Sequence, residues 1–154
     1  MNGQSGRIEA GQHVMALRVY YEDTDSGGMV YYANYLKYAE RARTEMLRLV
    51  GVDHETLARE HDLAFVVRSC TLACEKPARL DDLIEVRSRL LDLGGASLTA
   101  EQVIGRNGTE LARLDVRLAC MTAAGRPTRI PKTVREALAA YGPPSATRQP
   151  RERE

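Results

Sequence analysis

Apolar and polar side chains alternate along much of this chain, and a period of two residues is typical of a half-buried β-strand. The clearest example is residues 83–91, where Ile84 and Val86 share one face while Glu85 and Arg87 share the other. Residues 63–75 also predict a strand, and over residues 64–67 successive side chains on both faces of that strand are apolar. The pattern predicts strands over residues 14–21, 63–75, 83–91, 97–105 and 109–122.

The last two of these strands are separated by Asn107 and Gly108. An Asn-Gly pair between alternating stretches favours a two-residue hairpin turn, so we expect the two strands to pair antiparallel.

Helical spacing replaces alternation after residue 31. Tyr35, Ala42, Met46 and Leu49 recur at intervals of three, four and seven residues, which predicts an amphipathic helix of about four turns that ends near Gly51. Shorter helices are predicted within residues 52–62 and after Pro131. One strand, one long helix and four further strands make an α+β arrangement, with a helix packed on an antiparallel sheet.

The chain has 154 residues, of which 44% are hydrophobic, and this is enough for one domain with a real core. Residues 1–13 are rich in Gly, Ser and Gln, and we expect a flexible leader there. Residues 142–154 are charged and contain proline, which favours a disordered tail. The predicted single domain therefore covers residues 14–141.

Charge and composition exclude several classes of partner and location. The formal net charge is +1, which gives no reason to expect a nucleic-acid partner. No apolar run is long enough to span a membrane, and the first residues lack the hydrophobic core of a signal peptide. Cys70, Cys74 and Cys120 do not have the spacing of zinc ligands, so we expect buried, reduced thiols, no metal, no cofactor and a cytoplasmic location.

Candidate chemistry gathers in residues 20–35, with the sequence YYEDTDSGGMVYYANY. Carboxylates, two glycines and the start of the predicted long helix occur together there, so an acid such as Asp25 would face free N–H groups at the positive end of the helix dipole. That combination suits hydrolysis of an activated acyl group. The alternative is a capped, glycine-rich turn with solvated acids. His54 and His61 have no recognisable partner and are expected to be exposed polar residues.

The same stretch, followed by Glu-Arg-Ala-Arg-Thr-Glu-Met-Leu at residues 40–47, resembles the signature of the 4-hydroxybenzoyl-CoA thioesterase family, most closely its YbgC-type, Tol-Pal-associated branch. The resemblance covers residues 14–138. Further similar stretches are residues 65–68, 77–82 and 94–98. It implies the hotdog fold, a curved five-stranded antiparallel sheet wrapped around a long central helix. It also implies a homodimer with a continuous sheet, or a homotetramer, with active sites at the subunit interface.

The resemblance assigns roles to individual residues. It places the catalytic carboxylate on Asp25, as nucleophile or general base, and the oxyanion-binding backbone N–H on Tyr32. Four further residues are expected to contact substrate, with the last one reaching the thioester from the partner subunit: Gly28, Tyr31, Arg68 and Ser97. Arg68 and Ser97 also have plainer interpretations, as a solvated strand arginine and a hydroxyl at a strand start.

Two positions qualify this assignment. YbgC-type members commonly carry His where this chain has Tyr32, so an imidazole cannot take part there, although the backbone N–H remains. This difference would shift the substrate preference towards aromatic acyl groups. Glu40 resembles the region where a sister branch carries its own acid, but with Asp25 present we expect Glu40 to serve only the Glu-Arg helix pattern.

The resulting hypothesis is an acyl-CoA thioesterase that converts a short-chain or aromatic acyl-CoA to the free acid and coenzyme A. The alternative is a non-catalytic hotdog module that binds acyl-carrier protein or an envelope-related partner. A dehydratase-type hotdog is disfavoured because no histidine has a matching context. The sequence leaves the preferred acyl group and the choice between dimer and tetramer open.

Overall fold

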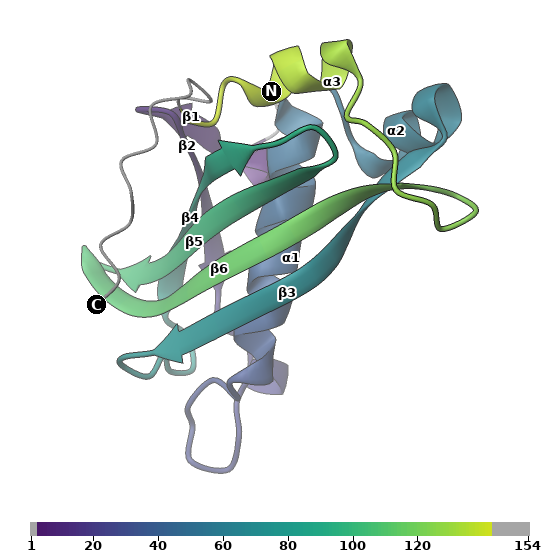
Figure 1. The fold of residues 1–154 in the computed structure, drawn as a ribbon. Coiled ribbons are helices and arrows are strands. Elements are labelled where there is room, and N and C mark those ends of the chain that lie inside the picture. Colours follow the sequence, from purple (N-terminus) through teal and green to yellow (C-terminus); the bar gives the residue numbers. More distant parts are fainter. Residues whose placement is uncertain (1–2, 143–154) are drawn as a thin grey trace, which may run out of the picture.

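A computed structural model describes residues 3–142 and shows one antiparallel sheet with a long helix along one face (Figure 1). The six strands lie in the order β1-β2-β4-β5-β6-β3. The strands are β1 (Arg7–Glu9), β2 (Gln12–Arg18), β3 (Leu63–Cys74), β4 (Leu83–Leu93), β5 (Ser97–Arg106) and β6 (Thr109–Thr122). The α-helices are α1 (Ala33–Leu49), α2 (His54–His61) and α3 (Lys132–Leu138), and 3-10 turns cover Gly3–Ser5 (η1) and Tyr21–Asp23 (η2). The predicted tail, apart from Gly142, lies outside the described residues.

This architecture confirms the predicted α+β hotdog arrangement, with one more strand than expected. The extra strand, β1, pairs antiparallel with β2 inside the segment that we expected to be a flexible leader. Ala10 and Gly11, which both have positive φ, make the turn between them. All three residues of β1 are exposed, so its sequence carries no alternation that could have revealed it.

Helix α1 packs its apolar stripe against the sheet, as its periodicity predicted. The buried residues of this stripe are Tyr35, Tyr38, Ala39, Ala42, Met46 and Leu47. Ala39 and Ala42 are fully buried, and their small side chains let the helix approach the strands closely. None of the helices in residues 3–142 is long and apolar enough to cross a membrane.

The two edges of the sheet differ. At one edge lies the short β1, and at the other lies β3, which has twelve residues and is exposed along most of its length. Val66 is 41% exposed and Val67 is 45% exposed. Cys70 and Cys74 are also exposed on this strand, which corrects the prediction of buried thiols, and only Cys120 is buried. The apolar run in β3 did not reveal that the strand lies at an edge.

Candidate active site

The loop before α1 is a closed turn held against a neighbouring segment. The Asp25 N–H donates to the Met29 carbonyl at 2.8 Å, and the Gly28 N–H donates back to the Asp25 carbonyl at 3.1 Å. Two further bonds fasten the loop to the segment before β4, from Val30 N–H to the Ala78 carbonyl and from Leu80 N–H to the Gly28 carbonyl. Gly28 has a φ of +73°, which favours glycine at this position. The position of Asp25 is therefore set by backbone hydrogen bonds.

Asp23 and Asp25, two residues apart, have different environments. Asp23 is buried, its carboxylate accepts the Tyr20 N–H at 2.8 Å, and its carbonyl accepts the Tyr31 N–H and the Asn34 side-chain amide. Asp25 is exposed, and its Oδ1 accepts the Gly27 N–H at 2.9 Å. Its Oδ2 has no hydrogen-bond partner in the part of the chain that the structure describes. Asp23 thus anchors the start of the helix, while Asp25 keeps one oxygen available.

The N-terminus of α1 follows directly. Tyr32 is the N-cap residue, with φ −57° and ψ −30°, and its own side chain makes no capping hydrogen bond within the described part of the chain. Among the described residues, no acceptor is found for the Tyr32 N–H, whereas the next N–H groups of Asn34 and Tyr35 bond to carbonyls of Tyr31 and Tyr32. A free N–H at the positive end of a seventeen-residue helix is suited to bind an oxygen that gains negative charge.

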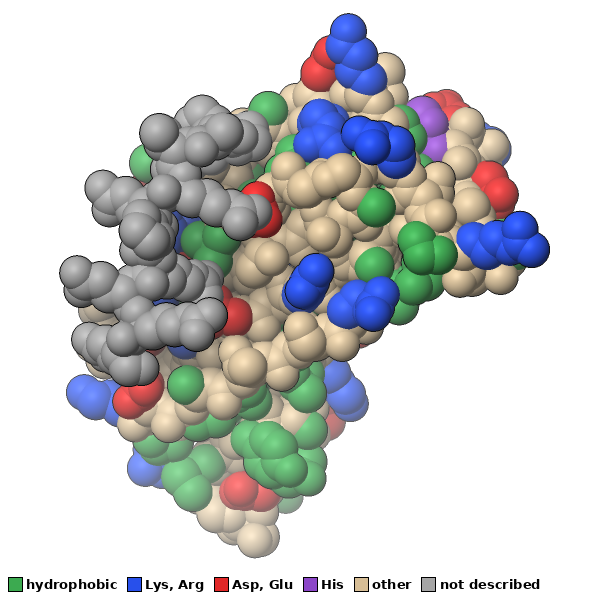
Figure 2. Space-filling model, in the orientation of Figure 1, with side chains coloured by type: hydrophobic (Ala, Val, Ile, Leu, Met, Phe, Trp, Pro, Cys, Tyr) green, Lys and Arg blue, Asp and Glu red, His purple; other side chains and the backbone are tan. Residues whose placement is uncertain are grey.

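Aromatic side chains surround this end of the molecule. Tyr31 and Tyr32 are 50% and 60% exposed, and their ring centroids lie 5.0 Å apart. Tyr20 and Tyr21 are exposed as well. Figure 2 shows hydrophobic side chains gathered at the lower end of the molecule, where Figure 1 places the loop before α1. Four exposed tyrosines therefore lie close in sequence to the exposed carboxylate of Asp25.

The structure brings Asp25, Gly28, Tyr31 and Tyr32 together but places Arg68 and Ser97 elsewhere in the same chain. Ser97 follows the far end of β4, which has eleven residues and therefore spans roughly 30 Å. The near end of β4 adjoins the loop, since Leu80, three residues before it, bonds to Gly28. Arg68 lies on the exposed edge strand, at an irregularity in its pairing with β6.

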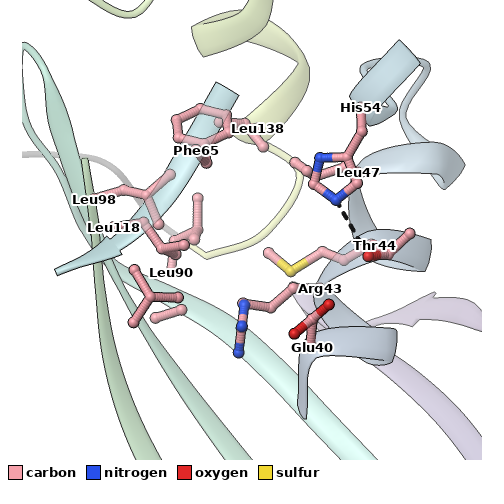
Figure 3. A pocket seen from close by; sticks show the side chains of 13 residues that line it. Glu40, Arg43, Thr44, Leu47, His54, Phe65, Leu90, Leu98, Leu118 and Leu138 are labelled. Carbon is pink, nitrogen blue, oxygen red and sulfur yellow. Dashed lines mark hydrogen bonds between the residues drawn. The ribbon is translucent and has the colours of Figure 1, made fainter. Parts of the chain in front are cut away.

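A cavity of about 280 Å³ lies between the C-terminal half of α1 and the sheet (Figure 3). Its lining includes neither Asp25 nor Tyr32. Side chains of the sheet and α3 make most of the wall apolar: Phe65, Val67, Leu90, Leu98, Ala100, Leu118 and Leu138. The polar groups come from the helices: Glu40, Arg43 and Thr44 from α1, and His54 from α2.

The sequence analysis considered Glu40 and His54 separately but did not predict that they lie together with Arg43 and Thr44. Glu40, Arg43, Thr44 and Leu47 are spaced by three, one and three residues, which places them on one face of α1, and this spacing was the signal that could have found them. His54 is exposed, as expected, but it has a partner that the sequence did not reveal, because its Nε2 lies 3.2 Å from the Thr44 hydroxyl.

A buried amide fixes the position of Arg43. Gln102 of β5 is fully buried, and its side-chain nitrogen donates to the Ala39 carbonyl and to the Ser88 hydroxyl, both at 2.9 Å. Its oxygen therefore faces Arg43 and accepts one N–H of the guanidinium at 2.9 Å. This network ties α1 to β4 and β5 through groups that are all hydrogen-bonded.

Comparison with known proteins identifies relatives over most of the chain. Residues 19–138 match the thioesterase-like superfamily. The acyl-CoA thioesterase YbgC of Haemophilus influenzae is 43% identical over 79% of this chain and 90% of its own length. The acyl-CoA thioester hydrolase YbgC of Escherichia coli O6:H1 is 40% identical over 77% of this chain and 89% of its own. The crystal structure of a probable thioesterase from Bartonella henselae has a TM-score of 0.75 at 36% identity, and covers 78% of this chain and 99% of the other.

Proposed function

Because this chain belongs to the thioesterase-like superfamily and is a YbgC-type thioester hydrolase, we propose that it hydrolyses a short-chain or aromatic acyl-CoA to the free acid and coenzyme A. Asp25 acts on the thioester carbonyl carbon, and the Tyr32 N–H binds the carbonyl oxygen. No cofactor is needed for this reaction, since thiolate is a good leaving group that requires little protonation.

One observation carries the proposal. A carboxylate with one oxygen fixed by backbone N–H groups and the other free lies in the loop that leads into α1. The N–H of Tyr32, the N-cap residue of that helix, has no acceptor among the described residues. The fixed oxygen limits the rotation of the Asp25 side chain, so the group is pre-organised for reaction. The free N–H of Tyr32 is pre-organised for the oxyanion, because it needs no partner to be broken first.

Two routes fit this geometry. As a general base, Asp25 takes a proton from a water molecule while the water oxygen attacks the thioester carbon. As a nucleophile, Asp25 attacks that carbon itself and forms a mixed anhydride, which water then hydrolyses. In both routes the carbonyl oxygen becomes negative against the Tyr32 N–H, the carbon–sulfur bond breaks, and coenzyme A leaves as a thiolate that is then protonated.

A homodimer would complete the site. Ser97 lies roughly 30 Å from the loop of its own chain, measured along β4, so it can serve Asp25 only from a second subunit. The exposed edge strand β3 offers a row of backbone groups for such pairing. We therefore place the active sites at the interface of a β3-paired dimer, with Ser97 and Arg68 contacting substrate across it. Pairing of two dimers into a tetramer is compatible with this arrangement, as is delivery of the acyl group by acyl-carrier protein.

The cytoplasm is the compartment that we propose for this activity. The three cysteines are free, and two of them are exposed on β3. Exposed thiols that are not paired suit a reducing compartment.

The first test concerns the catalytic role of the Asp25 carboxylate. Asp25→Asn is expected to lower kcat roughly a hundred- to ten-thousandfold, because general-base catalysis typically contributes that much. Thiol release from a panel of acyl-CoA esters of different length and aromaticity measures this effect. Thermal unfolding should be unchanged, because the Asn side-chain oxygen can still accept the Gly27 N–H.

The matched controls are other carboxylates. Glu22→Gln changes an exposed acid in η2, close to the loop that contains Asp25, and should leave kcat unchanged. Full activity of Asp25→Asn would contradict the proposal, and loss of activity only in Glu40→Gln would transfer the role of the acid to the carboxylate beside the cavity. Absence of thiol release from every ester, with formation of a complex with acyl-carrier protein, would instead favour the non-catalytic module.

The second test concerns the Tyr32 backbone N–H as the donor to the oxyanion. Tyr32→Pro removes the N–H, and the φ of −57° at this position is close to the value that proline requires. Tyr32→Ala removes the ring but keeps the N–H and is the matched control. We expect Tyr32→Pro to lose roughly a hundred- to a thousandfold in kcat relative to Tyr32→Ala. Equal rates in the two variants would show that the N–H is not the oxyanion donor.

A further inference from the structure

A short segment between β3 and β4 holds the loop that contains Asp25. This support segment, residues 77–82, has the sequence Pro-Ala-Arg-Leu-Asp-Asp. Within the loop, residues 24–30, only Val30 is buried. Its N–H donates to the carbonyl of Ala78 in the support segment at 2.8 Å. The position of the loop therefore depends more on backbone hydrogen bonds to the support segment than on the packing of its own side chains.

One guanidinium contacts both ends of the support segment. Arg106, the last residue of β5, forms an ion pair with the Asp82 carboxylate, and the same nitrogen lies 3.5 Å from the Pro77 carbonyl. The side chains of Arg106 and Asp82 are 30% and 22% exposed, so water screens this pair less than a fully solvated one. The Asp82 carboxylate also accepts the Arg79 N–H at 2.8 Å, which closes a turn within the segment. Asp82 therefore links the support segment to the end of β5.

A buried hydroxyl supports the same segment from the helix. Tyr35 of α1 is 2% exposed, and its side-chain oxygen accepts the Ala78 N–H at 3.1 Å. Ala78 is thus hydrogen-bonded on both sides, to Tyr35 through its N–H and to Val30 through its carbonyl. Tyr35 follows Tyr32 by three residues, so both lie on the same turn of α1. The turn that supplies the proposed oxyanion donor also supports the segment that holds the proposed catalytic acid.

We propose that Arg106, Asp82 and Tyr35 are positioning residues for the hydrolysis. Acting through the support segment, they fix the distance between the Asp25 carboxylate and the Tyr32 N–H. This inference rests on the proposed roles of Asp25 and Tyr32. Misplacement of a reacting group by about 1 Å can cost roughly a hundredfold in rate. Loss of these contacts should therefore lower kcat more than it changes substrate binding.

Hydrogen exchange measures how firmly the loop is held, without any catalysis. Arg106→Met removes the guanidinium and keeps most of the apolar stem. The Val30 and Leu80 N–H groups donate across the contact between loop and segment, and they should exchange roughly tenfold faster in this variant, because a charged hydrogen bond that holds the segment is lost. Amides in the middle of β6 report global unfolding and should change less. Equal acceleration of both sets of amides would overturn the proposal, because it would show a general loss of stability.

Steady-state thiol release measures the consequence for turnover. At a temperature where every variant is folded by circular dichroism, Arg106→Met should lower kcat roughly ten- to a hundredfold and leave KM unchanged. Arg106→Lys keeps a positive charge beside Asp82 and should recover most of the loss. Glu110→Gln, the matched control, breaks a different ion pair with Arg113 of β6 and should leave kcat unchanged. An unchanged kcat in Arg106→Met would overturn the proposal.

A second variant and a catalytic background complete the test. Should Arg106→Met fail to fold, Tyr35→Phe keeps the buried ring and removes only the acceptor of the Ala78 N–H. It should likewise accelerate exchange at Val30 and lower kcat at unchanged KM. In an Asp25→Asn background either substitution should cost little further activity, because the group that it positions is already lost.

Two outcomes separate this inference from the proposed function. A full additional loss of activity in the Asp25→Asn background would refute the positioning role while leaving the role of the acid intact. Full activity of Asp25→Asn alone would refute the proposed function and, with it, the role of the support segment in turnover. The exchange rates of Val30 and Leu80 measure the hold on the loop in either case.

Discussion

At the residue scale, His13 links the N-terminal segment to the core. It is fully buried in β2, and its Nε2 lies 2.7 Å from the Ser5 carbonyl, so this nitrogen carries the proton and donates. The other ring nitrogen, Nδ1, is buried and has no hydrogen-bond partner within residues 3–142. A second proton would have to be added at this nitrogen, and burial, which disfavours the charged ring, lowers the pKa of His13.

The sign of the resulting pH dependence follows from linkage. Because the folded-state pKa lies below the ordinary value of 6.5, the unfolded chain binds more protons as the pH falls through that value. The free energy of unfolding should therefore decrease as the pH falls from about 6.5 to the lowered folded-state pKa. Urea denaturation at several pH values measures this, and His13→Gln, which keeps a donor for Ser5, should flatten the dependence in this window. The same slope in His13→Gln would assign it to other groups.

At the element scale, Gln102 connects α1 to β4 and β5. Gln102→Leu keeps a similar volume but removes three hydrogen bonds and leaves Arg43 and the Ser88 hydroxyl without their partner. We expect a loss of about 2–4 kcal/mol in the free energy of unfolding, because buried polar groups are left unsatisfied. Chemical denaturation measures the loss, and Thr99→Ala, on the opposite face of β5, should change it much less. Equal losses of unfolding free energy in the two variants would mean that the hydrogen bonds of Gln102 do not stabilise the fold more than an ordinary side chain of β5 does.

The elements with the strongest periodicity were predicted best. Helix α1 and strands β4, β5 and β6 lie close to their predicted bounds, and Asn107 and Gly108 both have the positive φ of the expected turn. Each of these elements buries one face, so apolar residues recur along its sequence at a regular spacing. Strand β1 buries neither face, so its sequence has no regular spacing of apolar residues and the strand was not predicted.

Sequence reasoning reached the loop but not the cavity. Asp25, Gly28, Tyr31 and Tyr32 are close in sequence, and a local motif could identify them together. The cavity collects side chains from three helices and four strands, so its existence depends on how these elements pack. Whether a strand lies at an edge is likewise a property of the whole sheet, which is why the exposure of Cys70 and Cys74 on β3 was not foreseen.

At the scale of the whole molecule, the exposed edge strand β3 predicts self-association. Val66→Lys places a charge on this edge and should shift the protein towards monomers with reduced thiol release, because charged residues on an edge strand oppose strand pairing. Analytical ultracentrifugation over a range of concentrations measures the mass. Ile8→Lys makes the same change on the opposite edge of the sheet and is the control. A dimer of unchanged stability in Val66→Lys would exclude β3 as the interface.

The separation of the Asp25 loop and Ser97 by the length of β4 has a genetic consequence. If each active site combines Asp25 of one subunit with Ser97 of its partner, a mutation in one copy of the gene also affects an active site that contains a subunit encoded by the other copy. Two alleles, one defective in the acid and one in the serine, would then restore partial function when expressed together, because a mixed pair of subunits contains one centre with both parts intact.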